Sequence, residues 1–301
     1  DGEADADNVP EIDLGGESPW GFFMNGRASF GDAPRRDRDP GYEFETQGLT
    51  AGVDYRLSSS VVLGAALGYL RTDTEVQGGG TTDVEGYSLT GYLTWYGDSW
   101  YVDAVIGYGQ NDITTERAIE LPRAFLGVDR LVAVGEPDSD QLSVHLAYGY
   151  DTQIGRATTL TGFVRGSWVR ADVDAYTETG ALVFDLAYED QTVESLLGEV
   201  GFEVVHPLSM NWGVLQPMVR VSYLHEFEDD PQVLIGRFAR DPRARPFPIR
   251  GEAPDVDFFN LAAGLTATFP RGWAGYLQYD TDLERDDLDI YTLSGGFRLQ
   301  F

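Results

Sequence analysis

Histidine is the side chain most often used as a general acid or base, and this chain contains His145, His206 and His225. His225 stands in the stretch LHEFEDD beside Glu226 and Asp229, a combination that could serve a hydrolase as an acid/base pair. No second group completes that constellation. His145 falls within an alternating segment, where a hydrogen bond is the favoured role, and His206 precedes a proline in a short turn.

Other reactive groups are absent or belong to turns. The chain has no cysteine, which excludes disulfides, thiolate metal sites and cysteine nucleophiles. No GxSxG, HExxH or phosphate-binding loop occurs, and GDS at 97–99 has the composition of a turn. The acidic stretch TDLERDDLD (281–289) could bind Ca²⁺, but its spacing is not that of an EF-hand, which favours a solvated loop. The sequence therefore predicts no catalytic residue, no cofactor and no metal.

The chain carries a formal charge of −29, and all 21 of its cationic side chains are arginines. This balance argues against nucleic-acid binding, which needs a net cationic footprint. Five of the arginines fall within GRFARDPRARPFPIR (236–250). Because arginine makes bidentate contacts with phosphate and carboxylate, this stretch could contact lipopolysaccharide phosphates or fold over acidic neighbours. A solvated loop that balances nearby acids is the third possibility.

Most of the chain consists of segments in which apolar and polar residues alternate. In YSLTGYLTW (87–95), tyrosine, leucine and tryptophan share one parity, while serine and threonine dominate the other. Since a strand presents its side chains to two faces with a period of two, such segments are strands with one apolar face. Twelve of them occur, near 20–31, 41–56, 61–74, 83–96, 100–115, 139–154, 158–174, 190–206, 212–226, 255–269, 273–281 and 287–301.

The connections between these segments alternate in length. Every second connection is a short turn, at 57–60, 97–99, 155–157, 207–211 and 270–272. The remaining connections are mostly longer and polar. Aromatic residues of the apolar parity gather near both ends of the segments, as at the two interfaces of a bilayer. These features predict an all-β fold, a transmembrane up-and-down antiparallel β-barrel of twelve strands integral to a bacterial outer membrane. An even strand count places the N- and C-terminal strand ends on the periplasmic side.

The last segment, YTLSGGFRLQF, is the most regular one. An open edge in lipid leaves backbone groups unpaired, so this strand must close the barrel against the first strand. A terminal aromatic with apolar residues at every second preceding position also looks like the signal read by the barrel assembly machinery of Gram-negative bacteria. The residues of this assembly signal are Tyr291, Leu293, Gly295, Phe297, Leu299 and Phe301.

The stretch around 41–120 resembles the translocator domain of autotransporters (type V secretion). The resemblance rests on GLTAGVDYRL followed by LGAALGY, and with the last strand it covers residues 20–301. It implies a monomeric barrel that helps an N-terminal passenger polypeptide reach the cell surface, with a linker threading the pore. The expected partners are this passenger, the assembly machinery, membrane lipid and lipopolysaccharide. The alternatives are a stand-alone barrel acting as adhesin or small pore, and a barrel hydrolase using His225.

Residues 1–19 differ from the rest, because they hold seven acids, no base and two prolines. Such a segment cannot bury enough apolar surface to fold alone, and it is predicted to be a linker within the lumen of the barrel formed by 20–301. The linker acids expected to face lumen arginines are Asp5, Asp7, Glu11 and Asp13. Strand parity predicts a lumen polar network of Asn25, Arg27, Asp54, Arg165, Glu199, Glu203, Arg220, Asp280 and Arg298.

Overall fold

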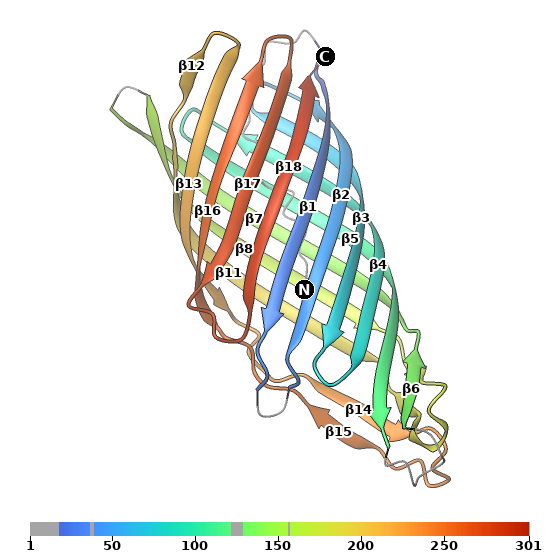
Figure 1. Ribbon diagram of the computed structural model, residues 1–301. Helices are drawn as coiled ribbons and strands as arrows, with labels where there is room; N and C mark the ends of the chain where they lie inside the picture. Colours follow the sequence, from blue (N-terminus) through green and yellow to red (C-terminus); the bar gives the residue numbers. More distant parts are fainter. Residues whose placement is uncertain (1–17, 37–38, 122–128, 156, 301) are drawn as a thin grey trace.

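Twelve long strands dominate the computed structural model, which describes residues 18–36, 39–121, 129–155 and 157–300 (Figure 1). The alternating segments form these strands because their tyrosine, valine, threonine and leucine side chains suit a pleated surface that is buried on one face. The twelve are β1 (Trp20–Ala33), β2 (Tyr42–Arg56), β3 (Val61–Val76), β4 (Gly80–Tyr96), β5 (Trp100–Glu120), β7 (Asp138–Ile154), β8 (Thr158–Val173), β11 (Gln191–Val205), β13 (Gly213–Glu226), β16 (Asp257–Phe269), β17 (Trp273–Leu283) and β18 (Asp289–Gln300).

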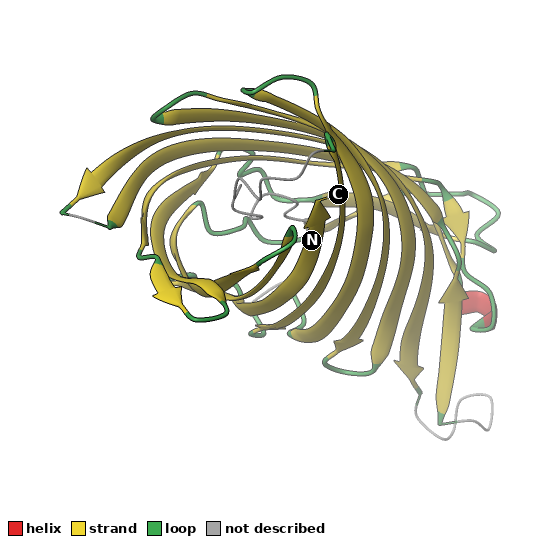
Figure 2. Cartoon of the chain, turned by 90° about the horizontal axis from the view of Figure 1, so that it is seen from above, coloured by secondary structure: helices red, strands yellow, loops and turns green. Residues whose placement is uncertain are grey.

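Each of these strands pairs antiparallel with the next one along the chain, and the sheet closes on itself. β18 pairs with β1 from Gly21↔Gln300 to Asp32↔Asp289, while β11 pairs with β13 on the opposite side of the ring. Seen from above, the strands form a ring around a central space (Figure 2). The predicted all-β, twelve-stranded antiparallel barrel is thereby confirmed, including closure by the last strand.

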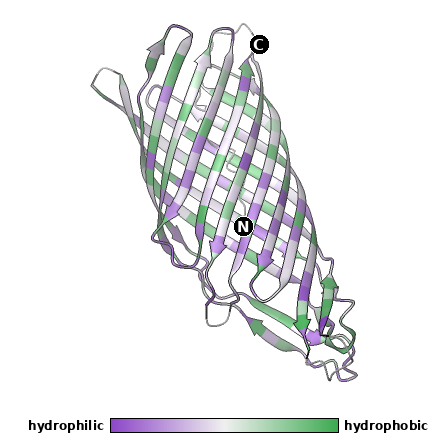
Figure 3. Cartoon of the chain, viewed as in Figure 1, coloured by the Kyte–Doolittle hydropathy of each residue, from purple (hydrophilic) through white to green (hydrophobic). Residues whose placement is uncertain are grey.

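The wall of the barrel inverts the usual arrangement of a globular protein. Its large apolar side chains face outward, so that Leu67 is 68%, Tyr87 65% and Phe202 62% exposed. The most buried side chains include polar ones, with Ser29 at 1% and Arg220 at 3% exposure. Hydrophobic and hydrophilic residues consequently alternate along the barrel strands (Figure 3). An apolar outer belt of this extent is the surface that a bilayer covers.

Outward aromatic side chains gather toward both ends of the wall. Trp95 and Trp100 meet edge to face across the turn at 97–99, with ring centroids 4.9 Å apart. Toward the other end, Tyr69 lies beside Tyr87 at 5.2 Å. Within the described residues, no helix is long and apolar enough to cross a membrane.

The two ends of the barrel differ in how their strands are connected. The start of β1 and the end of β18 lie at the end with short turns, and the longer connections lie at the other (Figure 1). Two predicted connections are wrong in detail. The connection expected at 75–82, between the segments 61–74 and 83–96, is only a turn at 77–79, because β3 and β4 continue their pairing to Val76↔Gly80. The turn predicted at 207–211 contains β12 (Leu208–Met210), which pairs with β13 and moves the reversal to 211–212.

Beyond the end with long connections lies a second sheet that periodicity did not predict. The outer sheet, as we call it, has the strand order β15-β14-β10-β9, and the short 3₁₀ helix η1 (Leu182–Phe184) precedes β10. β6 (Arg130–Gly135) prolongs the barrel here by pairing with the end of β5. The outer strands are β9 (Tyr176–Thr177), β10 (Leu186–Tyr188), β14 (Val233–Phe238) and β15 (Phe247–Arg250).

A buried ion pair fastens the outer sheet to the barrel. The carboxylate of Glu178, which is 3% exposed, accepts two hydrogen bonds from Arg117 on β5, at 2.9 and 2.5 Å. It also accepts the backbone N–H of Leu186 at 2.8 Å. Burial, together with the charge of Glu178, raises the pKa of Tyr188 to about 12, so this phenol stays neutral. The sheet is therefore an ordered part of the molecule.

Candidate functional site

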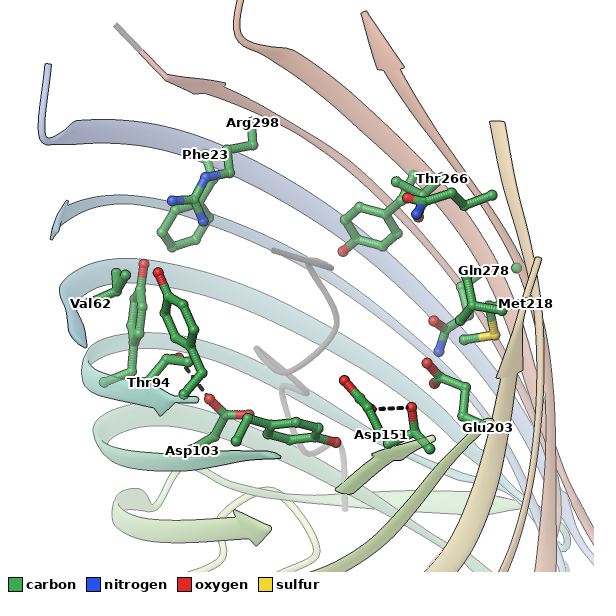
Figure 4. Close-up of a pocket in the computed structure, with 18 of the residues that line it drawn as sticks. Phe23, Val62, Thr94, Asp103, Asp151, Glu203, Met218, Thr266, Gln278 and Arg298 are labelled. Atoms are coloured by element: carbon green, nitrogen blue, oxygen red, sulfur yellow. Dashed lines mark hydrogen bonds between the residues drawn. The ribbon is translucent and has the colours of Figure 1, made fainter. Parts of the chain in front are cut away.

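The barrel encloses a cavity of about 610 Å³ in the half that carries the short turns. All twelve barrel strands contribute to its lining, from Phe23 on β1 to Arg298 on β18, so the cavity surrounds the barrel axis. Asp103, Asp151 and Glu203 reach this space from different parts of the wall (Figure 4). The side chains of the wall therefore leave this half of the barrel interior partly unfilled.

An ion pair between Asp54 and Arg298 lies at the seam of the barrel. The carboxylate of Asp54, 2% exposed, accepts a hydrogen bond from Arg298 Nη2 at 2.7 Å and one from the Tyr92 hydroxyl at 3.3 Å. Asp54 and Arg298 stand on strands that flank β1 on its two sides, and Gly21 of β1 is the register partner of Asp54. A Cβ at Gly21 would approach Asp54 Oδ1 to 2.7 Å, so glycine leaves room for the carboxylate.

Two further ion pairs link strands elsewhere in the wall. Arg165 on β8 binds Glu199 on β11 at 3.4 Å, and its guanidinium lies 4.4 Å from the ring centroid of Phe163. Arg220 on β13 binds Asp280 on β17 at 2.9 Å. The side-chain amide of Gln278 donates to the same carboxylate at 2.9 Å. These side chains cross-brace three separate parts of the wall.

The structure thus brings six of the nine predicted lumen residues together as three ion pairs. Glu203 lines the cavity and stands opposite Arg220 in the β11–β13 register. Arg27 donates from Nε to the Ser29 hydroxyl at 3.1 Å. Asn25 Oδ1 and Arg27 Nη1 are buried and have no hydrogen-bond partner among the described residues.

Sequence reasoning missed several lumen groups that the same rule of parity would have found. Asp103 accepts a hydrogen bond from Thr94 at 2.7 Å, and Asp151 accepts one from Thr161 at 2.7 Å (Figure 4). Both carboxylates stand on the polar parity of their strands. Tyr92 was equally detectable, because it interrupts a run of serine and threonine on the inner face of β4.

The five residues of the predicted assembly signal that the structure describes share the outer face of β18. Tyr291, Leu293 and Phe297 are about two-fifths exposed, and Gly295 and Leu299 have the same parity. Gln300 points inward and is buried. Phe301 lies outside the described residues, as do the linker acids Asp5, Asp7, Glu11 and Asp13.

The three histidines occupy separate positions. His145 Nδ1 lies 2.9 Å from the Ser167 hydroxyl on the inner face, which is the hydrogen bond expected for it. His206 Nδ1 lies 2.8 Å from the Thr158 hydroxyl near the short turns. His225 faces outward, and its partner is Asp257 on β16, at 2.7 Å, instead of the neighbouring Glu226 or Asp229.

Among the described residues, the hydroxyl that shares the Asp257 carboxylate with His225 is that of Tyr223. Glu226 points to the inner face, where it accepts a hydrogen bond from the Ser195 hydroxyl at 2.6 Å. The sheet therefore separates this hydroxyl from the imidazole. In the acidic loop after β17, Arg285 binds both Asp282 and Asp287, at 3.1 and 2.8 Å. No cluster of potential metal ligands occurs among the described residues.

Comparison with known proteins decides the family. The model of the autotransporter β-domain matches residues 22–280, which is most of the barrel. The chain belongs to the autotransporter β-domain family. Its location is accordingly the bacterial outer membrane, in which the barrel is an integral protein.

Solved autotransporter barrels have the same fold. The translocator domain of NalP from Neisseria meningitidis superposes with a TM-score of 0.73 at 16% identity, covering 96% of this chain and 90% of that one. The β-domain of the Bordetella autotransporter BrkA gives 0.70 at 18% identity, with 94% and 100% covered.

Curated relatives extend far beyond the matched region. Lipase 1 of Photorhabdus luminescens is 23% identical over 83% of this chain, and esterase EstA of Pseudomonas aeruginosa is 25% identical over 82%. Outer membrane protein A of Rickettsia conorii is 24% identical over 81%. The chain spans only 37%, 38% and 12% of the length of these three relatives. Their names describe whole proteins, of which this autotransporter barrel matches one part.

Proposed function

We propose that this barrel translocates an N-terminal passenger to the cell surface, with the segment before Trp20 leading through or alongside its lumen. One observation carries the proposal. The carbonyl oxygen of Pro19 accepts the backbone N–H of Arg56 at 2.8 Å, and Arg56 lines the lumen cavity. The chain therefore enters β1 from beside the cavity, at the end with the short turns. A segment that precedes β1 could therefore enter the pore directly.

The chemistry of the lumen suits a guest peptide. Its mixed charges can hold a polar chain without a strong preference for one sequence. Arg165, Arg220 and Arg298 each already bind a carboxylate of the wall, so acids of a linker would add to existing pairs.

Conductance of single channels tests whether residues 1–17 occupy the lumen. Deleting them, or changing Asp5, Asp7, Glu11 and Asp13 to their amides, is expected to raise conductance in planar bilayers several-fold. The matched control is Glu43→Gln with Glu45→Gln, which removes acids from the outer surface of β2. Unchanged conductance after the deletion would contradict a linker in the pore.

Surface display tests translocation itself. A reporter domain fused before residue 1 is expected to become accessible to external protease in cells that export the full chain. Protection of the reporter in intact cells, with the barrel correctly inserted, would refute translocation. That result would favour a stand-alone adhesin or small pore, for which the ordered outer sheet would be the binding surface.

We further propose that the end with the short turns faces the periplasm and that the assembly machinery recognises the outer face of β18. The barrel would act as a monomer, with its outer belt in contact with lipid. Deletion of Phe301 is expected to reduce insertion far more than Gln300→Ala, because Gln300 points into the lumen. Equal insertion of both variants would argue against recognition of the terminal aromatic.

The barrel itself is proposed to lack hydrolase activity. The fold is that of a transport barrel, and the imidazole of His225 lies on the face opposite the Ser195 hydroxyl. Any lipase or esterase activity of the whole protein would then belong to a passenger. Hydrolysis of a chromogenic ester by the purified 301-residue chain, abolished by His225→Ala, would overturn this assignment.

A further inference from the structure

The hairpin formed by β14 and β15 concentrates positive charge in a strongly anionic protein. Residues 236–250 contain five arginines and a single acid, although the whole chain has a net charge of −29. All five arginine side chains are exposed. They are Arg237, Arg240, Arg243, Arg245 and Arg250. No other stretch of similar length in the sequence carries a comparable surplus of positive charge.

Most of this charge is not neutralised by the protein. Arg245 binds Asp241 at 3.1 Å. For the other four arginines, no carboxylate lies within ion-pair distance in the part of the chain that the structure describes. The exposed arginines on the outer face of the barrel behave differently. Arg71 binds Asp73 and Glu85 at 2.8 and 3.6 Å. Arg170 likewise binds two acids of its own and the next strand.

Backbone hydrogen bonds order the hairpin that carries these side chains. Asp241 accepts the N–H of Arg243 at 2.9 Å, and its carbonyl oxygen accepts the N–H of Ala244 at 2.9 Å. The N–H of Ala239 donates to the carbonyl of Asp185 at 2.9 Å, which ties the hairpin to η1 and β10. Three prolines within 242–248 restrict the chain further. An ordered surface loses less conformational entropy when it binds.

The height of the hairpin above the membrane indicates what it can reach. Tyr108 belongs to the aromatic side chains that gather toward the end of the wall with the long connections. Arg117, which fastens the outer sheet, lies nine residues further along β5. At a rise of about 3.3 Å per residue and a tilt of about 40°, this distance amounts to roughly 20 Å of height. Between these levels the acids Asp73, Asp83 and Glu85 outnumber Arg71 on the outer face, so this part of the wall carries net negative charge.

We propose that the hairpin 236–250 binds phosphate groups on the core sugars of lipopolysaccharide in the surrounding outer leaflet. The phosphates of the lipid A backbone lie at the level of the aromatic belt, and the acidic part of the wall separates them from the hairpin. Phosphates on the sugars further out lie at the level of the arginines. A guanidinium binds such groups bidentately, and several exposed guanidinium groups can engage several phosphates at once. The inference rests on the proposed orientation, with the short turns in the periplasm, and does not depend on passenger transport.

The test compares the full 301-residue protein with two variants in detergent, using purified rough lipopolysaccharide with phosphorylated core sugars as the probe. The hairpin variant is Arg237→Gln, Arg240→Gln, Arg243→Gln and Arg250→Gln. The control is Arg71→Gln with Arg170→Gln, which removes two exposed arginines from the outer wall. The hairpin variant is expected to bind about 10-fold more weakly, and the control within about twofold of the wild type. Binding by the wild type should also weaken as salt is added.

Two other probes identify the source of the anion. Enzymatically dephosphorylated lipopolysaccharide, and lipid A without core sugars, are each expected to bind the wild type as weakly as the hairpin variant binds the intact probe. Gel migration of unboiled samples verifies that all variants form closed barrels. Equal affinity of the hairpin variant and wild type for the intact probe would overturn the proposal. Undiminished binding of the dephosphorylated probe would overturn it too, as would tighter binding of a synthetic peptide of residues 1–17.

Discussion

The arginines of the lumen and those of the outer hairpin have opposite surroundings. Arg298 and Arg220 are largely buried, and each is held by a carboxylate from another strand. Arg243 and Arg250 protrude into solvent at the other end of the molecule without such a partner in the described chain. A buried charge must be compensated where it stands, whereas an exposed charge remains available to a ligand. The same residue type therefore braces one region and presents charge in the other.

The largest effect is expected where a buried pair loses one member. Asp54→Asn leaves the guanidinium of Arg298 with no counter-charge in the wall and should cost about 3–5 kcal/mol of unfolding free energy. Denaturant titration of the detergent-solubilised barrel measures the change. The double variant Asp54→Asn with Arg298→Gln is expected to recover part of the loss. A single variant as stable as wild type would show that the pair is well hydrated.

A smaller and local effect is expected at the fastening of the outer sheet. Glu178→Gln removes the charge that holds Arg117, so the outer sheet should open more often while the barrel keeps its stability. Faster trypsin cleavage within 236–250 would report this opening. Glu189→Gln, at an exposed position one residue after β10, is the matched control. Equal cleavage rates in the two variants would mean that backbone pairing alone holds the sheet.

Exposed ion pairs should contribute still less to the free energy of unfolding. His225 pairs with Asp257 on the outer face, and the Tyr223 hydroxyl donates to the same carboxylate. Because solvent screens such a pair, His225→Ala is expected to shift the unfolding midpoint only slightly. A loss as large as that of Asp54→Asn would mean that this cluster braces the wall.

The smallest effect is expected for an arginine of the hairpin. Arg243→Gln should leave the unfolding midpoint of the barrel unchanged, because the side chain makes no ion pair within the described protein. Unfolding by denaturant provides the comparison with Arg298→Gln. If the two substitutions destabilise the barrel equally, the arginines of the lumen and those of the hairpin do not differ in their structural role.

The barrel could be predicted from sequence because its determinants are local. A period of two in strands such as β4 and β7 shows which residues face lipid, and alternating connection lengths show how the strands are ordered. Parity also placed Asp54 and Arg298 on the inner side. It could not pair them, because they stand on strands separated by β1, and the small size of Gly21 permits the contact.

The outer sheet escaped prediction for a different reason. β9 and β10 are two and three residues long, too short for any periodicity to be visible. β10 is ordered by pairing with β14, some fifty residues away, from Leu186↔Phe238 to Tyr188↔Gly236. A strand whose partner is distant and whose length is minimal leaves no local signal.

Closure of the barrel by β18 also has a kinetic consequence. Ser29 on β1 bonds the Thr292 hydroxyl at 2.9 Å, a contact between residues 263 positions apart, and contacts of such separation form slowly. Until β18 arrives, both β1 and β17 expose an unpaired edge that costs several kcal/mol per backbone group in hydrocarbon. A chain arrested before β18 thus has no stable membrane-embedded intermediate. Insertion and closure have to coincide, and arrested chains are expected to collect in water as aggregation-prone species.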